Sequence, residues 1–360
     1  QINASKYDPA EAVIVINNYR RNDWKPYVFK TNNYGKSWKS IVDEEKVWGH
    51  ALSFVQDPIE PNLQFLGTEY GLYVTLDNAK TWTKWTSGYP TVSTMDLKIH
   101  PRENDLVIGT FGRAAYILDD IRPLREMAST KKDLMDKRLH FFEPPTAVLA
   151  INRQASGTRF EANAIFTGEN RGRGAMLTFV FNSDKKKKEK PKKDKGDKKG
   201  KPENKKEKVT MEVLDEDGKV IRTVKHNVEA GINRVYWGLQ RKGVRSPNAP
   251  KPTKPNAREP GGPPVLPGEY TIRLSHGTDT TTQVVNVILD PRVGINTRNL
   301  EQLQPIYQRQ MEITALVTKA MDRIRKSKKI VESVNKMLDV KKNKSHKTLQ
   351  NNGKSMTDSL

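Results

Sequence analysis

The sequence contains no cysteine among its 360 residues, which excludes disulfide bridges, thiolate metal sites and a cysteine nucleophile. It has no run of about 18 apolar residues, so we expect no membrane span. Phosphate-binding loops, nucleotide fingerprints and the HExxH and Gly-x-Ser-x-Gly motifs are also absent. The six histidines lack the spacing of metal ligands, and we predict neither a metal nor a cofactor.

Positive charge is present in excess, with 63 Lys and Arg against 42 Asp and Glu. Residues 184–208 hold 14 lysines and 6 acidic residues, and residues 319–360 hold 12 basic and 4 acidic ones. The first segment has almost no apolar side chains, so we expect a disordered insertion. Nucleic-acid binding by this segment is the less favoured interpretation, because its lysines alternate with acids and no stacking aromatics accompany them.

Two related octads occur in the first third of the chain, at residues 31–38 and 75–82. Both read Thr-x-Asx-x-small-Lys-Ser/Thr-Trp. The Asx side chain can bond to the backbone of a tight turn, and the Trp can pack between neighbouring sheets. The runs 65–68 and 107–110 repeat at a similar distance. A period near 43 residues with several short strands per unit is typical of β-propeller blades.

The octads resemble the Asp-box, the BNR repeat of sialidases and of sortilin-type Vps10 propellers. The matching residues are Asn33, Gly35, Trp38, Asp77 and Trp82. The resemblance implies that they build blade turns and do not contact ligand. Asn33 replaces the usual Asp and Ala79 replaces the usual Gly, so we expect the second turn to be strained.

The wider segment 8–125 is similar to the closing blades of a large bacterial family, named Vps10 or sortilin-like proteins or glycosyl hydrolases with BNR repeats. The similarity lies in the blocks 48–51, 66–74, 109–113 and 117–120. Residues 1–125 would then be the last two to three blades, and we expect the rest of the propeller from a missing N-terminal part. The resemblance also implies an extracytoplasmic location, whether secreted, periplasmic or at the cell surface.

After a linker over 126–145, residues 146–292 contain short β-rich runs with turns between them, which predicts a β-sandwich. The runs 215–219, 231–237 and 267–271 resemble the immunoglobulin-like domain of the flagellar hook-capping type. The Lys-rich insertion 184–208 and a loop over 246–267 with eight prolines interrupt it. Trp237 is in phase with Val235, which favours a core position over a carbohydrate platform.

In residues 293–360, apolar residues recur at spacings of three and four, which predicts an amphipathic helix. The pattern exceeds about 25 residues, so we expect a truncated helical hairpin with a break near 325–329. Its basic face is interpreted as the solvated side of a helix pair, with a membrane surface or a partner helix as alternatives. The predicted fold is therefore mainly β: terminal propeller blades, an Ig-like β-sandwich and a C-terminal α-helical segment.

Candidate site residues lie on loops that flank the repeated strands. The candidate ligand-binding residues are Trp48, His50, Tyr70, Phe111 and Arg113, and Glu69 is the candidate catalytic carboxylate. Packing between blades is the alternative role for all six. Glycoside hydrolysis needs two carboxyl groups about 5–9.5 Å apart, and the partner of Glu69 would come from the missing blades. A single Arg113 does not make the three-arginine cluster of sialidases.

We predict a sortilin-like scaffold that binds a peptide, protein or glycan ligand. The alternative is a glycoside hydrolase of the BNR-repeat type, which the family resemblance suggests and these residues alone do not show.

Overall fold

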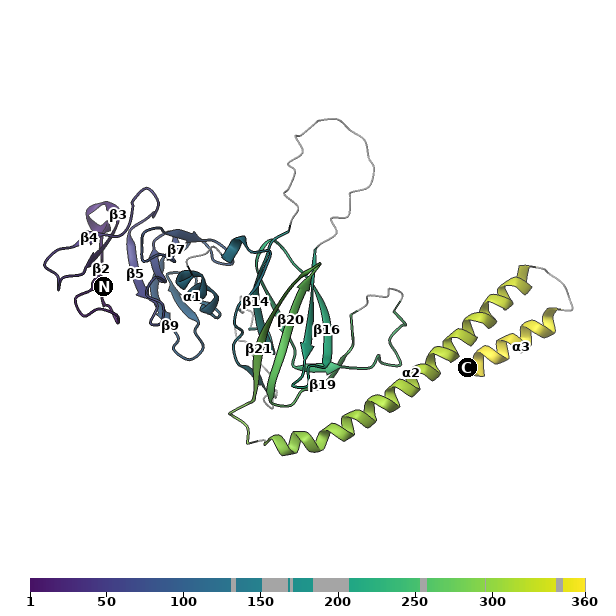
Figure 1. Cartoon of the computed structure of the whole chain (residues 1–360). Helices are drawn as coiled ribbons and strands as arrows, with labels where there is room; N and C mark the ends of the chain where they lie inside the picture. The colour runs from purple at the N-terminus through teal and green to yellow at the C-terminus, as the bar shows by residue number, and fades with distance from the viewer. Residues whose placement is uncertain are drawn as a thin grey trace.

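The computed structural model describes residues 1–130, 134–150, 168, 171–183, 207–252, 258–294, 296–340 and 346–359. Three parts follow one another along the molecule: a set of small sheets, a β-sandwich and two C-terminal helices (Figure 1). The fold is mainly β with a C-terminal helical segment, as predicted. Nearly all of the Lys-rich insertion, and residues 253–257 of the proline-rich loop, lie outside the described residues.

The N-terminal part consists of three antiparallel meanders, which we call the first, second and third blades. The first blade has β1 (Ile2–Ala4), β2 (Ala12–Asn18), β3 (Asp23–Thr31) and β4 (Lys39–Ser40). The second has β5 (Ala51–Gln56), β6 (Gln64–Thr68), β7 (Gly71–Thr75) and β8 (Thr83–Trp85). The third has β9 (Thr94–Ile99), β10 (Leu106–Thr110) and β11 (Ala115–Leu118).

The second blade is buried on both faces, between the first and the third. Phe65 and Leu72 pack into one hydrophobic cluster with residues of the third blade. Leu66 and Tyr73, the next residues along the same strands, pack into a second cluster with residues of the first blade. Successive strand residues point to opposite faces, so a strand buried on both sides is a continuous apolar run. This is why residues 65–66 and 72–74 show no polar alternation.

A short helix closes the blades and leads into the sandwich. α1 (Arg122–Ser129) begins with Pro123 in its first turn and packs Leu124 into the cluster between the second and third blades. Pro is favoured there because the first helical N–H groups have no intrahelical acceptor. A 3-10 turn over Leu134–Asp136 follows, and Leu134 packs against Phe142. The described part of 126–145, expected to be a linker, is therefore ordered and partly buried.

The sandwich is made of two main sheets. The first pairs β12 (Leu139–Phe141), β14 (Ala175–Phe181) and β17 (Gly231–Trp237) in that order. The second has the order β13 (Ala147–Leu149), β21 (Asp279–Leu289), β20 (Gly268–His276), β15 (Lys208–Leu214) and β16 (Val220–Asn227). β13 runs parallel to β21, and the other pairs are antiparallel.

The core position expected for Trp237 in the sandwich is confirmed. Trp237 is 2% exposed and packs edge-on against Tyr270, so it belongs to the core and offers no carbohydrate platform. Gly218 adopts a φ of 73°, as the hairpin turn requires. The proline-rich loop contains regular structure, because β19 (Gly261–Pro264) lies within it and pairs with β18 (Gln240–Lys242), which precedes the loop.

The C-terminal segment contains α2 (Thr297–Val340) and α3 (His346–Ser359). The break expected near 325–329 is wrong, since α2 passes through these residues without interruption. The segment Arg-Lys-Ser-Lys-Lys contains neither Gly nor Pro, and its cations alone do not stop a helix. Among the described residues, no helix is both long enough and apolar enough to span a membrane.

Candidate functional site

Three hairpin turns and two connecting loops meet at one edge of the blades. Successive turns of an antiparallel meander alternate between two edges, so the β2–β3, β6–β7 and β10–β11 turns share one edge and the two octads lie at the other. The loops before β5 and β9 reach the first edge, which we call the Glu69 edge. It carries all six residues predicted from the sequence: Trp48, His50, Glu69, Tyr70, Phe111 and Arg113.

Backbone and side-chain contacts join the second and third blades along the Glu69 edge. The N–H of Glu69 donates to the carbonyl of His50 at 3.1 Å. Ser93 lies before β9; its hydroxyl donates to the Glu69 carbonyl at 3.3 Å, and its own carbonyl accepts the N–H of Phe111 at 2.9 Å. Gly49 has a φ of 80°, and a Cβ there would lie 2.8 Å from the Tyr70 ring. Glycine thus lets the loop before β5 close onto the β6–β7 turn.

A histidine and a carboxylate meet at the centre of this edge. His50 Nδ1 lies 3.1 Å from Glu69 Oε2, and His50 is only 7% exposed. The pair is close but not aligned for a hydrogen bond, and neither atom has a hydrogen-bond partner in the part of the chain that the structure describes. The imidazole stacks on Tyr19 at a centroid distance of 5.0 Å and lies 5.7 Å from the ring of Trp24.

Exposed aromatic side chains surround this pair. Trp24 is 48%, Trp48 61% and Phe111 75% exposed, and Tyr70 is also exposed. We call these four residues the aromatic rim. A folded protein gains from burying such large apolar surfaces, so exposed ones that gather at a single edge typically mark an interaction site.

The two indoles are held in fixed orientations by their own N–H groups. Trp24 Nε1 donates to Asn22 Oδ1 at 3.0 Å, and Trp48 Nε1 donates to the Glu45 carbonyl at 3.1 Å. Their polar atoms are therefore occupied, while much of each ring surface stays open. Both indoles line one open groove, whose other lining residues are Asn22, Asp23, Lys25, Pro26, Glu44, Val47 and Gly49.

The sequence did not single out Tyr19 and Trp24, which complete the surroundings of His50. Both flank the β2–β3 turn, which occupies in the first blade the place that Glu69 and Tyr70 occupy in the second. The offset of 44 residues between the octads carries Glu69 and Tyr70 back to Lys25 and Pro26, so the repeat register does not identify Tyr19 and Trp24. Arg113 lies on the same edge and is exposed.

The octads serve turn formation at the opposite edge. Asp77 Oδ1 accepts the N–H groups of Lys80 and Thr81 at 3.1 and 2.9 Å. Asn33 Oδ1 accepts the Ser37 N–H at 3.0 Å, so the amide replaces the carboxylate in the first octad. Trp82 Nε1 donates to the Ile41 carbonyl at 2.8 Å and so joins two blades. Ala79 has a φ of 63°, which confirms the strain expected where glycine is absent.

In the first octad, Gly35 and Trp38 contact each other within the turn itself. Gly35 has a φ of 79°, and Trp38 Nε1 donates to its carbonyl at 3.1 Å. Trp38 is partly exposed and bonds only within the turn, whereas Trp82 reaches the neighbouring blade.

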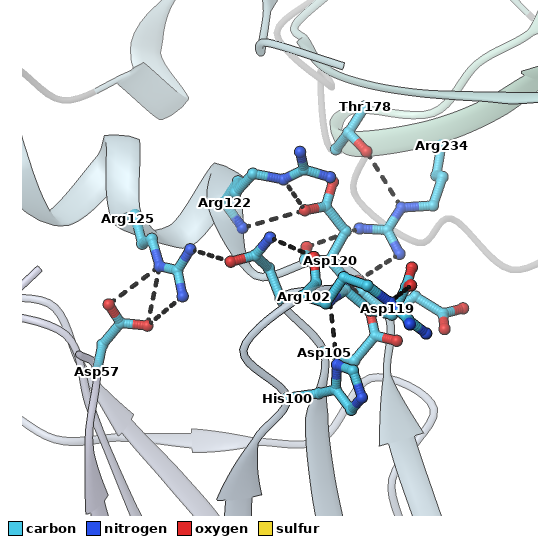
Figure 2. A network of polar contacts seen from close by, with 12 residues as sticks. Asp57, His100, Arg102, Asp105, Asp119, Asp120, Arg122, Arg125, Thr178 and Arg234 are labelled. Carbon is cyan, nitrogen blue, oxygen red and sulfur yellow. Dashed lines mark hydrogen bonds and ion pairs between the residues drawn. The ribbon is translucent and has the colours of Figure 1, made fainter. Parts of the chain in front are cut away.

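A second polar cluster lies where the blades meet the sandwich (Figure 2). Arg125, on α1, pairs with the buried Asp57 through Nε and Nη2 at 2.9–3.0 Å. Asp120 accepts Arg122 Nε at 2.5 Å. Burial, followed by the charge of Asp105, raises the pKa of Asp119 above its usual range. Arg125 and Asp57 bond to each other, as do Arg122 and Asp120, which gives the cluster a structural role.

The Glu69 edge has the groups for recognition and few for catalysis. No three His, Cys, Asp or Glu side chains come together as metal ligands within the described ranges. Asp23, the acidic residue nearest to Trp24 in the groove, is hydrogen-bonded by Asn18 and Tyr27 at 3.2 and 2.7 Å. Glu69 is the one carboxylate that the sequence predicted to be catalytic. Among the described residues, its side chain is paired with His50 and not with the second acid that glycoside hydrolysis needs.

Comparison with known proteins gives limited similarity. No protein-family model matches the chain, and no curated protein matches it. Among solved structures, the crystal structure of the GH74 enzyme of Niastella koreensis matches at 16% sequence identity with a TM-score of 0.29. The match covers 41% of this chain and 24% of that enzyme, so the chain spans about a quarter of it. The chain is weakly similar in structure to part of that enzyme.

Proposed function

We propose that residues 1–125 contain blades of a sortilin-like β-propeller scaffold and that the Glu69 edge binds a peptide, protein or glycan ligand. The observation that carries this proposal is the aromatic rim around the nearly buried His50–Glu69 pair. Rigid aromatic side chains supply large contact area at a low cost in conformational entropy. They are also the residues that most often dominate binding energy when they are enclosed by a partner.

The polar centre supports binding of a ligand that carries hydrogen-bonding groups. His50 Nδ1 and Glu69 Oε2 lie beneath the rim without aligned partners, and an unsatisfied buried polar atom costs about 1–3 kcal/mol. A ligand hydroxyl or amide that bonds to this pair would recover part of that cost. The rings would cover its apolar surface at the same time.

Glycoside hydrolysis is the second candidate function, and the position of Glu69 favours it. This carboxylate is partly exposed, at a turn in the centre of the edge, where a substrate bound to the rim would reach it. We further propose an extracytoplasmic location, on the family resemblance of the blades alone.

The test is binding of the 360-residue chain to glycan and peptide arrays, with turnover of each bound glycan measured in parallel. Saturable binding that Trp24→Ala and Trp48→Ala each weaken about tenfold would support the scaffold, as would unchanged binding by Tyr34→Asn. Tyr34 is an exposed aromatic at the opposite edge with a φ of 59°, which Asn tolerates. Binding unaffected by both tryptophan variants would refute the site. Glycan turnover abolished by Glu69→Gln would establish the hydrolase instead.

A further inference from the structure

α2 carries a regular apolar stripe along its exposed side. Its positions run from Leu303 to Val334 in alternating steps of three and four, and eight of the ten are apolar. Gln310 and Ser327 are the two polar positions. Alternating steps of three and four residues, sustained over about four heptads, are typical of the a and d positions of a coiled coil. Ile306 is 61% exposed, and Ile313 and Val317 are also exposed.

The opposite side of α2 is anchored to the rest of the chain. The hydroxyl of Thr318 donates to the Arg245 carbonyl at 2.8 Å, and the Arg245 side chain pairs with Asp322. Farther along, Asn335 packs against Gly353 of α3 so closely that a Cβ on the glycine would lie 2.3 Å from the amide oxygen. The contacts of Thr318 and Asp322 leave Ile306, Ile313 and Val317 exposed, whereas α3 packs beside the end of the stripe at Asn335, which follows Val334. Figure 1 shows α2 extending well beyond the sandwich.

The charges beside the stripe have one dominant sign. Residues 319–329 contain six Lys and Arg and a single acid, Asp322, which already pairs with Arg245 and Arg325. Arg323 and Lys328 occupy the g and e positions that flank the seam. In a parallel second copy, Arg323 would face Lys328 of the other helix, and like charges at these positions oppose pairing. The flanks therefore fit a partner of the opposite charge.

The shape of the stripe favours a helix over a lipid surface. A helix that lies on a membrane has a broad apolar face, usually with Trp or Phe, whereas α2 contains neither residue. The 3.5-residue repeat instead generates a seam that a second helix covers, and exposed Leu316 and Ile330 flank this seam at g positions. A shallow groove at Ile306, Gln310 and Ile313 is the kind of hole that receives a side chain from a facing helix.

We propose that the α2 stripe docks an acidic amphipathic helix of a partner protein as a two-stranded coiled coil. The apolar residues of the partner would cover Ile306, Ile313 and Val317, and its carboxylates would lie beside Arg323 and Lys328. This interaction uses residues far from the Glu69 edge and is independent of the function proposed for the blades.

The test uses the full chain and a labelled synthetic helix of about four heptads, with Ile at a, Leu at d and Glu at e and g. Fluorescence anisotropy is expected to show saturable binding that weakens at high salt. The same peptide with Lys at e and g should bind at least about tenfold more weakly. The double variant Ile306→Ser/Ile313→Ser should lower affinity about tenfold or more, while Ala315→Ser, at an exposed position off the stripe, should not. Circular dichroism would confirm equal helix content in all variants.

Four outcomes would overturn the proposal. The first is no binding of the acidic peptide at about 100 μM, and the second is equal binding of both peptides. The third is sedimentation as a dimer that Ile306→Ser/Ile313→Ser dissociates, which would make a second copy the occupant. The fourth is cosedimentation with phosphatidylserine vesicles that the same variant abolishes, which would make a lipid surface the occupant.

Discussion

Arg234, on strand β17 of the sandwich, donates hydrogen bonds from its guanidinium to the backbone carbonyls of Asp119 and Asp120 at 2.8 and 3.3 Å. Its Nε also donates to Thr178 Oγ1 at 3.1 Å, within the sandwich (Figure 2). One side chain therefore ties the end of the third blade to strands β14 and β17 of a sandwich sheet. The two parts are joined by a rigid polar contact as well as by the chain.

We expect Arg234→Ala to uncouple unfolding of the blades from unfolding of the sandwich. Loss of a charged donor to backbone carbonyls should lower the free energy of unfolding by about 1–3 kcal/mol. Differential scanning calorimetry should then resolve two transitions where the parent chain shows a more cooperative one. Arg234→Lys retains the charge without the planar fork and should give an intermediate result. An unchanged thermogram for Arg234→Ala would show that the contact does not couple the two parts.

The buried ion pair of Arg125 and Asp57 gives a second prediction. Arg125→Met leaves the Asp57 carboxylate without its cation, in a site where the carboxylate also accepts the N–H groups of Ile59 and Glu60. Breaking a buried pair from one side costs about 3–5 kcal/mol, measured as a shift of the urea unfolding midpoint.

The matched control for this pair is the double variant Arg125→Met/Asp57→Asn. It keeps an oxygen that can accept from the turn and removes the unpaired charge, so it should be more stable than Arg125→Met alone. A double variant as unstable as the single one would assign the loss to packing of the arginine stem and not to charge.

Much of the β-sheet structure in the N-terminal part could be predicted from local sequence, because the turns and the buried strands each have a recognisable residue pattern. The octads mark a turn in each of two blades, and the apolar runs 65–66 and 72–74 mark strands that are buried on both faces. The Glu69 edge could be predicted in the same way, since Glu69 ends a repeated strand. Tyr19 and Trp24 were missed because the β2–β3 turn contains no motif and shows its place only through pairing.

The joint between the parts could not be predicted. Arg234 and Asp119 are 115 residues apart in the sequence. Every residue has a backbone carbonyl, so the identity of the accepting residues does not reveal that a guanidinium binds there. The false break in α2 has a different origin. The length of the apolar pattern favoured two helices, but helix ends need a breaker or a cap, and residues 325–329 supply neither.

The strained turn of the second octad predicts a stabilising substitution. Ala79 has a φ of 63°, where a Cβ costs about 1–2 kcal/mol, so Ala79→Gly should raise the free energy of unfolding by about that amount. The first octad offers the reverse experiment, because Gly35 has a φ of 79° and a Cβ there would meet only Trp38, at 3.6 Å. Gly35→Ala should therefore lower stability by a similar amount. Thermal melts in which both variants move in the same direction would contradict the backbone explanation.

The raised pKa of Asp119 predicts how stability depends on pH. Burial, and then the charge of Asp105, raise this pKa in the folded state above its unfolded value. The folded state therefore holds the proton more tightly, and the Asp119 contribution to stability falls as pH rises from the unfolded pKa, about 3.9, through the folded one. Asp119→Asn removes this loss. Its stability relative to the parent should increase over that pH range and then stay constant at higher pH.

Asp77 provides a control of opposite sign for this titration. Partial burial acts to raise its pKa, but hydrogen bonds from the Thr81 hydroxyl and N–H prevail and lower it. Its stabilisation is present above the unfolded pKa and is lost as pH falls through the folded one. Asp77→Asn should therefore be less stable than the parent at neutral pH and approach it in acid. Urea unfolding between about pH 3 and pH 7 measures both variants, and parallel pH profiles would contradict the assignment of opposite shifts.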